Sequence, residues 1–140
     1  MIAYLDSSVI LRVVLGQPNA LAEWDQIERG VLSALAEVEC LRTLDRVRVL
    51  EGLADIELAR RREAVFRLMD TMDVVELTRT VLSRAAQPLP TALGTLDAIH
   101  LATALLWRER FGTDLVMATH DDALGTAARA SGLRVIGLTS

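Results

Sequence analysis

The acidic residues that border apolar runs are the ones best placed to do chemistry in this sequence. Asp6 directly follows the apolar run 2–5, and Asp121 comes shortly after a second apolar run, 115–118. Asp97 begins a segment that is apolar nearly all round, where a carboxylate is costly unless something pairs with it. Carboxylates in such places are candidate ligands for a divalent cation.

Each of these acids also has an ordinary structural interpretation. Asp is a preferred N-cap, and the helix dipole favours an acid in the first turn of a helix. Asp122 competes with Asp121, because Thr119 followed three residues later by Asp122 fits a capping box. That role for Asp122 leaves Asp121 freer to face the edge of a sheet. The fourth acid is Glu37 or Glu39, which a helical wheel does not separate.

Several carboxylates at one site need a countercharge, because like charges raise each other's pKa. All 15 basic residues are Arg, and the absence of Lys excludes a Walker phosphate loop and a receiver-type phosphoacceptor. The lone Cys40 excludes a Cys-based zinc site and is expected to fill the core, as is a hydrogen-bonded His100. An all-oxygen ligand set suits Mg²⁺ or Mn²⁺. Such ions serve phosphoryl transfer, in which they activate water and neutralise charge on the phosphate.

The composition predicts one α/β domain that spans residues 1–140. With 51% apolar residues, some apolar surface is expected to be reserved for a partner. The net charge of −4 is unlike that of a typical nucleic-acid binder, but setting four of the 19 acids around cations leaves 15 acids against 15 basic residues. No stretch is long enough to span a membrane and no basic leader is present, so we expect a cytoplasmic protein.

Strand and helix patterns alternate along the chain, which predicts a central, mostly parallel sheet flanked by helices. Parallel strands share an edge at their carboxyl ends, where ligands of open α/β sheets collect. Strands are expected at 2–5, 31–32, 74–77, 115–118 and 135–136. Helices are expected from Ser7 or Ser8 as cap to 14, at 19–29, from Ser33 to 52, at 54–72, at 80–86, from Thr95 as cap to 110, and from Thr119 as cap to 132. The two long helices would form a helical hairpin.

These segments resemble the PIN-domain nucleases and, within them, the VapC toxins of bacterial toxin–antitoxin pairs. The resemblance covers the whole chain in the family's order and length. Its most specific piece is Asp-Ala-Ile-His-Leu-Ala at 97–102. The other matching pieces are Tyr4-Leu5-Asp6-Ser7-Ser8, Val38-Glu39-Cys40-Leu41-Arg42, Thr119-His120-Asp121-Asp122-Ala123-Leu124, Ala127-Ala128 and Gly132-Leu133. The resemblance therefore implies a single PIN-like domain.

The resemblance also resolves the two open choices among the acids. The family's acid in the third helix is followed three residues later by Arg, here Arg42, which selects Glu39 over Glu37. The family's Thr-x-Asp form selects Asp121 over Asp122. The implied acidic quartet is Asp6, Glu39, Asp97 and Asp121.

The function implied by the resemblance is a Mg²⁺- or Mn²⁺-dependent endoribonuclease that leaves a 3′-hydroxyl and a 5′-phosphate. Asp6 and Asp97 would be the main metal ligands, and Glu39 and Asp121 would orient waters around the ion or hold a second ion. Ser8 and Thr119 would support them as hydrogen-bond donors. The family further implies a homodimer and a cognate VapB-type antitoxin, whose C-terminal tail lies across the active-site groove.

Two other function classes fit the same residues. One is a different metal-dependent phosphohydrolase, acting on DNA or on small phosphoesters. The other is a non-catalytic binding module with a PIN fold, in which the acids serve as helix caps. Arg60, Arg61, Arg62 and Arg67 either grip RNA phosphates or antitoxin acids, or simply form a solvated helix face.

Overall fold

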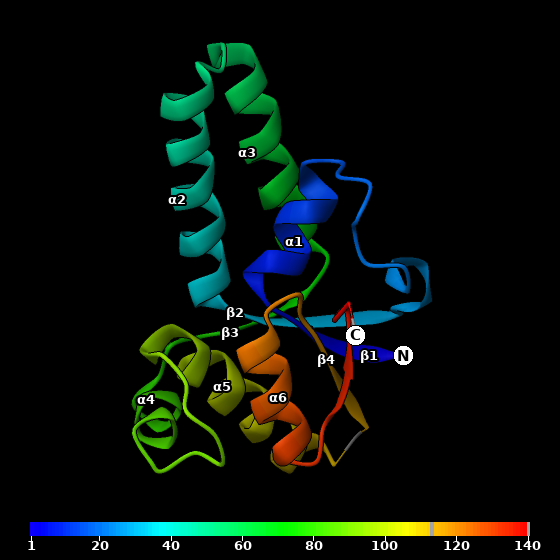
Figure 1. Ribbon diagram of the computed structural model, residues 1–140, viewed down its shortest axis with the longest axis vertical. Coiled ribbons are helices and arrows are strands. Elements are labelled where there is room, and N and C mark those ends of the chain that lie inside the picture. The colour runs from blue at the N-terminus through cyan, green and yellow to red at the C-terminus, as the bar shows by residue number, and fades with distance from the viewer. Residues whose placement is uncertain (113, 140) are drawn as a thin grey trace.

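The computed structural model describes residues 1–112 and 114–139 (Figure 1). Within these ranges, five strands form one parallel sheet, and six α-helices accompany it. The strands are β1 (Ile2–Leu5), β2 (Arg29–Ser33), β3 (Asp73–Val75), β4 (Leu115–Ala118) and β5 (Arg134–Ile136). The helices are α1 (Ser7–Val14), α2 (Ala34–Glu51), α3 (Asp55–Asp70), α4 (Arg79–Ala85), α5 (Thr95–Phe111) and α6 (Asp122–Ala130). The predicted α/β class with a parallel sheet is confirmed.

The strand order β3-β2-β1-β4-β5 creates a switch point between β1 and β4. From β1 the chain winds outward to β3 and then returns to place β4 on the other side of β1. A crevice opens at such a point beyond the carboxyl ends of the two strands. The Asp6 N–H donates to the Ala118 carbonyl at 3.3 Å, so the segments that follow β1 and β4 start side by side.

Helices cover both faces of the sheet. The helices α1, α2 and α3 lie on one face and α5 and α6 on the other, with α4 packed beside α5 (Figure 1). Successive side chains of β1 point to opposite faces, so Leu5 joins the core under α1 to α3 and Tyr4 joins the core under α5 and α6. Cys40 is buried in the first core, as predicted.

The helical hairpin and the buried helix α5 also match the sequence prediction. Figure 1 shows α2 and α3 projecting from the sheet as an antiparallel pair, and Gly52 ends α2 in the left-handed conformation at φ +64°. Helix α5 buries most of its first three turns, from Ala98 to Leu105. Among the residues that the structure describes, no helix is long and apolar enough to cross a membrane.

The helix predicted at 19–29 is wrong. The structure has only a short 3₁₀ turn at Trp24–Gln26, and Arg29 already belongs to β2. The Glu28 N–H donates to the Met1 carbonyl at 3.0 Å, and β2 then pairs with β1. Pairing with the central strand thus overrides the local helical pattern.

Three predicted helix caps are also replaced by neighbouring residues. Asp6, not Ser7 or Ser8, caps α1, and Gly94, not Thr95, precedes α5. Asp121 caps α6 through its own side chain, whereas Thr119 lies two residues before the cap. The hydroxyls of Ser8 and Thr119 instead donate to the Asp6 side chain.

Candidate active site

Asp6 is held at the end of β1 by hydrogen bonds from two other segments. The residue is only 4% exposed. The Ser8 hydroxyl donates to Oδ1 at 2.6 Å and the Val9 N–H to the same atom at 3.3 Å. The Thr119 hydroxyl donates to Oδ2 at 2.6 Å. Both hydroxyls expected as supporting donors therefore contact this carboxylate, and its orientation is fixed.

The turn after β4 is tied to the turn after β1. The Asp121 N–H donates to the Thr119 hydroxyl oxygen at 3.0 Å, and the His120 N–H donates to the Ser8 hydroxyl oxygen at 3.1 Å. The Asp121 carboxylate accepts from the Leu124 N–H at 3.0 Å as the N-cap of α6. Asp121 is half-buried, whereas its neighbour in the sequence, Asp122, is exposed.

Asp97 lies in the first turn of α5, and the other three acids affect its pKa. Burial raises the pKa of Asp97, and the charges of Asp121, Asp6 and Glu39 raise it further, while His100 acts in the opposite direction. Four carboxylates from the ends of two strands and from two helices are therefore close enough to interact. They come from segments that are far apart in the sequence.

Glu39 reaches the site from α2 and contacts a buried histidine. Its Oε1 lies 2.5 Å from Nε2 of His100, and Nδ1 of His100 lies 2.6 Å from the Tyr4 hydroxyl. The sequence predicts His100 as a hydrogen-bonded core residue, which is confirmed, since its side chain is 2% exposed. The contact with Glu39 was not predicted, although His100 follows Asp97 by about one helical turn.

The structure groups Glu39 and Asp121, and not Glu37 and Asp122, with Asp97. Neither Glu37 nor Asp122 contributes to the raised pKa of Asp97. Among the described residues, no arginine forms an ion pair with any acid of the quartet. The same residues contain no preassembled cluster of three or more metal-ligating side chains. Within the described part of the chain, the site is thus a group of carboxylates without an arginine partner.

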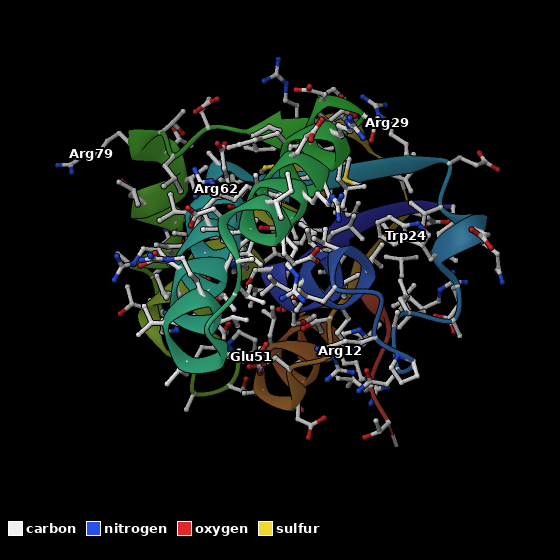
Figure 2. All side chains as sticks on the ribbon, turned by 90° about the horizontal axis from the view of Figure 1, so that it is seen from above. Arg12, Trp24, Arg29, Glu51, Arg62 and Arg79 are labelled. Atoms are coloured by element: carbon white, nitrogen blue, oxygen red, sulfur yellow. The ribbon has the colours of Figure 1, made fainter. Side chains whose placement is uncertain are left out.

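The arginines of α3 are occupied by their own helix. Arg60 and Arg61 pair with Glu57, Arg67 pairs with Glu63, and Arg62 lies over the ring of Phe66. Figure 2 looks down on the α2–α3 hairpin and shows Arg62 on it, while Arg79 of α4 points outward at the edge of the molecule. These contacts favour the interpretation of a solvated helix face.

Comparison with known proteins gives a consistent result. The PIN domain model matches residues 3–129. Ribonuclease VapC46 of Mycobacterium tuberculosis is 38% identical over 137 residues, covering 95% of each chain, and ribonuclease VapC35 of the same species is 34% identical over 138 residues, covering 95% of this chain and 94% of the relative. A toxin–antitoxin complex from Klebsiella pneumoniae shares the fold with a TM-score of 0.67 and 16% identity, over 96% of this chain and 95% of that one. The chain therefore belongs to the PIN-domain family and, within it, to the VapC group.

Proposed function

We propose that this protein is a metal-dependent endoribonuclease and the toxin of a toxin–antitoxin pair. The observation that carries the proposal is the convergence of Asp6, Glu39, Asp97 and Asp121 at the switch point of the sheet. None of these four acids pairs with an arginine in residues 1–112 and 114–139. The relatives named ribonucleases, which align over nearly the whole chain, supply the reaction class.

The donor set at this site fits Mg²⁺ or Mn²⁺. Mg²⁺ is usually held by one or two carboxylates, with water completing its shell, so a complete cage of protein ligands is not required. Asp6 and Asp97 would hold the ion, and Glu39 and Asp121 would orient the surrounding waters or hold a second ion. When bound, the ion would activate a water and neutralise charge that develops on the phosphate.

The residues of the chain supply the orientation that this chemistry needs. Ser8 and Thr119 each use a hydroxyl to hold one oxygen of Asp6, so the carboxylate keeps one direction toward the site. Asp121 is fixed as a helix cap through Oδ1, which leaves Oδ2 for the site. Preorganised ligands of this kind lose little freedom when substrate and ion bind.

The proposal includes two protein partners, a second copy of the chain and a VapB-type antitoxin, in the cytoplasm. Apolar side chains are exposed near the end of the α2–α3 hairpin, among them Val49, Leu50 and Ile56. An exposed apolar surface of this kind is typical of a protein-binding site. This surface agrees with the apolar excess in the composition.

The test compares purified wild type with matched pairs of variants on total cellular RNA, with Mg²⁺ or Mn²⁺ and with a chelator. Asp121→Asn should abolish cleavage, whereas Asp122→Asn, which changes the adjacent exposed acid, should not. Glu39→Gln should likewise abolish cleavage and Glu37→Gln should not. Discrete fragments that are lost with the chelator would support a metal-dependent endoribonuclease.

Two other outcomes would overturn the proposal in different ways. Metal-dependent cleavage of DNA or of small phosphoesters, with RNA left intact, would identify another phosphohydrolase. Folded wild type that neither binds Mn²⁺ in calorimetry nor cleaves any of these substrates would identify a non-catalytic binding module.

A further inference from the structure

A chain of hydrogen bonds leads from the core to the active-site edge of the sheet. It begins at the Tyr4 hydroxyl on β1, passes through both ring nitrogens of His100 on α5, and ends at the Glu39 carboxylate on α2. Tyr4 is completely buried and His100 is 1% exposed. Glu39 is the first member of this chain that reaches solvent, with 21% of its side chain exposed.

Glu39 is held in place by His100. Within residues 1–112 and 114–139, the only hydrogen bond to its side chain comes from Nε2 of His100. Glu has three rotatable side-chain bonds, and a partly exposed Glu without a partner samples several rotamers. The ring of His100 cannot follow such motion, because its other nitrogen is bound to Tyr4 inside the core.

The hydrogen bond to Glu39 requires a proton on Nε2 of His100. Burial, together with the charge of Asp6, raises the pKa of Tyr4, so the phenol keeps its proton and can donate it to Nδ1. An ionised carboxylate only accepts hydrogen bonds, so Nε2 is the donor in its contact with Glu39. A ring without a proton on Nε2 would set a lone pair against the carboxylate oxygen.

We propose that His100 is a positioning residue that fixes the Glu39 carboxylate toward the metal and substrate, and that Tyr4 holds the His100 ring in the orientation that lets it do so. This inference rests on the proposed function, because it concerns how one acid of the quartet is oriented. Partners that orient a metal ligand typically contribute 10- to 100-fold in metal affinity or activity. We expect the loss of the His100 contact to reduce affinity or activity by about as much.

The test uses two substitutions that preserve different nitrogens of the ring. The amide nitrogen of His100→Gln can take the place of Nε2 and still donate to Glu39, whereas the shorter amide of His100→Asn reaches only the place of Nδ1. Mn²⁺ affinity is measured by calorimetry, and kcat and KM on an RNA that the wild type cleaves. We expect His100→Asn to lose about 10- to 100-fold in affinity and in kcat. His100→Gln should stay closer to wild type than to His100→Asn.

A spectroscopic measurement tests the hydrogen bond from Nε2 to Glu39 independently of activity in the His100 variants. Nitrogen-15 NMR of wild-type His100 should show a proton on Nε2 that is hydrogen-bonded to a carboxylate, and Tyr4→Phe should weaken that signature because the ring loses its second anchor. A ring without a proton on Nε2 in the wild type would overturn the inference.

The remaining outcomes separate this inference from the proposed function. Unchanged affinity and kcat in folded His100→Asn would overturn the positioning role and leave the proposed function standing. Equal losses in His100→Asn and His100→Gln would assign the effect to core packing and also overturn the role. Wild type that binds no Mn²⁺ and cleaves no RNA would overturn both.

Discussion

Asp97 carries a charge that the fold disfavours. Its pKa is raised by burial and by the charges of Asp121, Asp6 and Glu39, so the folded protein binds the proton more tightly than the unfolded chain does. The free energy of unfolding therefore falls as pH rises from the ordinary carboxyl pKa through the raised one, and it stays lower at neutral pH. Ionisation of Asp97 thus opposes folding when no cation is bound.

We predict that Asp97→Asn raises the thermal unfolding midpoint at pH 7 in the presence of a chelator and abolishes cleavage. The gain should shrink as the pH falls toward about 4, where the wild-type carboxyl is protonated too. Differential scanning calorimetry at several pH values measures this effect. A stability gain that does not change with pH would show that the charge is not its cause.

The same substitution at Asp6 should have the opposite effect on stability. The Asp6 carboxylate accepts from two hydroxyls and a backbone N–H, and an amide can replace only one of its two oxygens as an acceptor. Asp6→Asn should therefore lower the free energy of unfolding by about 1 to 3 kcal/mol, because a buried donor loses its acceptor. Urea unfolding beside Asp97→Asn provides the comparison. If both variants were stabilised, repulsion among the acids would dominate at Asp6 as well.

At the scale of the elements, the turn after β5 supports the turn that carries the site. Gly137 has φ +101°, and a Cβ there would lie 2.5 Å from the Thr119 carbonyl oxygen. The imidazole of His120 also binds this turn, through Nδ1 and the Gly137 carbonyl at 2.7 Å. A side chain at position 137 would therefore displace the segment from which Thr119 donates to Asp6.

Gly137→Ala should lower both stability and cleavage, and Gly16→Ala is its control. Gly16 also has a positive φ, +63°, but a Cβ there meets no atom within 4 Å. The free energy of unfolding of the control should fall only by the cost of a positive φ in a non-glycine residue, about 1 kcal/mol, with cleavage unchanged. Gly137→Ala should lose about 2 kcal/mol more through the clash with Thr119. If urea unfolding showed equal losses of stability in the two variants, the Thr119 segment would be able to move away from the new Cβ at no cost.

The elements also show what the sequence could and could not predict. The apolar runs at 2–5 and 115–118 became buried parallel strands because nothing local competes with burial there. The helix prediction for 19–29 was wrong because helical spacing reflects only neighbouring residues. The pairing of β2 with β1 depends on a strand at the other end of a long connection. The prediction of Thr119 as a helix cap was wrong for a similar reason. Its hydroxyl donates to Asp6, which is 113 residues away in the sequence.

At the scale of the whole molecule, the position of each acid next to an apolar run was enough to predict that Asp6 and Asp121 meet at one edge. The pattern of residue types did not distinguish Glu39 from Glu37, because both lie on α2. They differ in their contact with α5, where only Glu39 has a hydrogen-bond partner among the described residues. The choice in the structure follows from His100 on α5, whose side chain contacts Glu39 of α2. No pattern in the sequence indicates that contact between side chains of two helices.

The whole acidic group should respond to pH as one metal site. Protons compete with a cation for the same oxygens, so the rise in unfolding midpoint caused by Mn²⁺ should shrink from pH 8 to pH 5. The raised pKa of Asp97 means that this competition begins at a higher pH than for an ordinary carboxyl. At 100 times its dissociation constant an ion stabilises the fold by about 2.7 kcal/mol, which a melting experiment resolves easily.

Asp122→Asn should keep the wild-type pH dependence, because that acid lies outside the group, and Asp97→Asn should remove most of the Mn²⁺ effect at every pH. A Mn²⁺ effect that is equally large at pH 5 and pH 8 would mean that the ion binds elsewhere, because protonation of Asp97 weakens any site that uses its carboxylate.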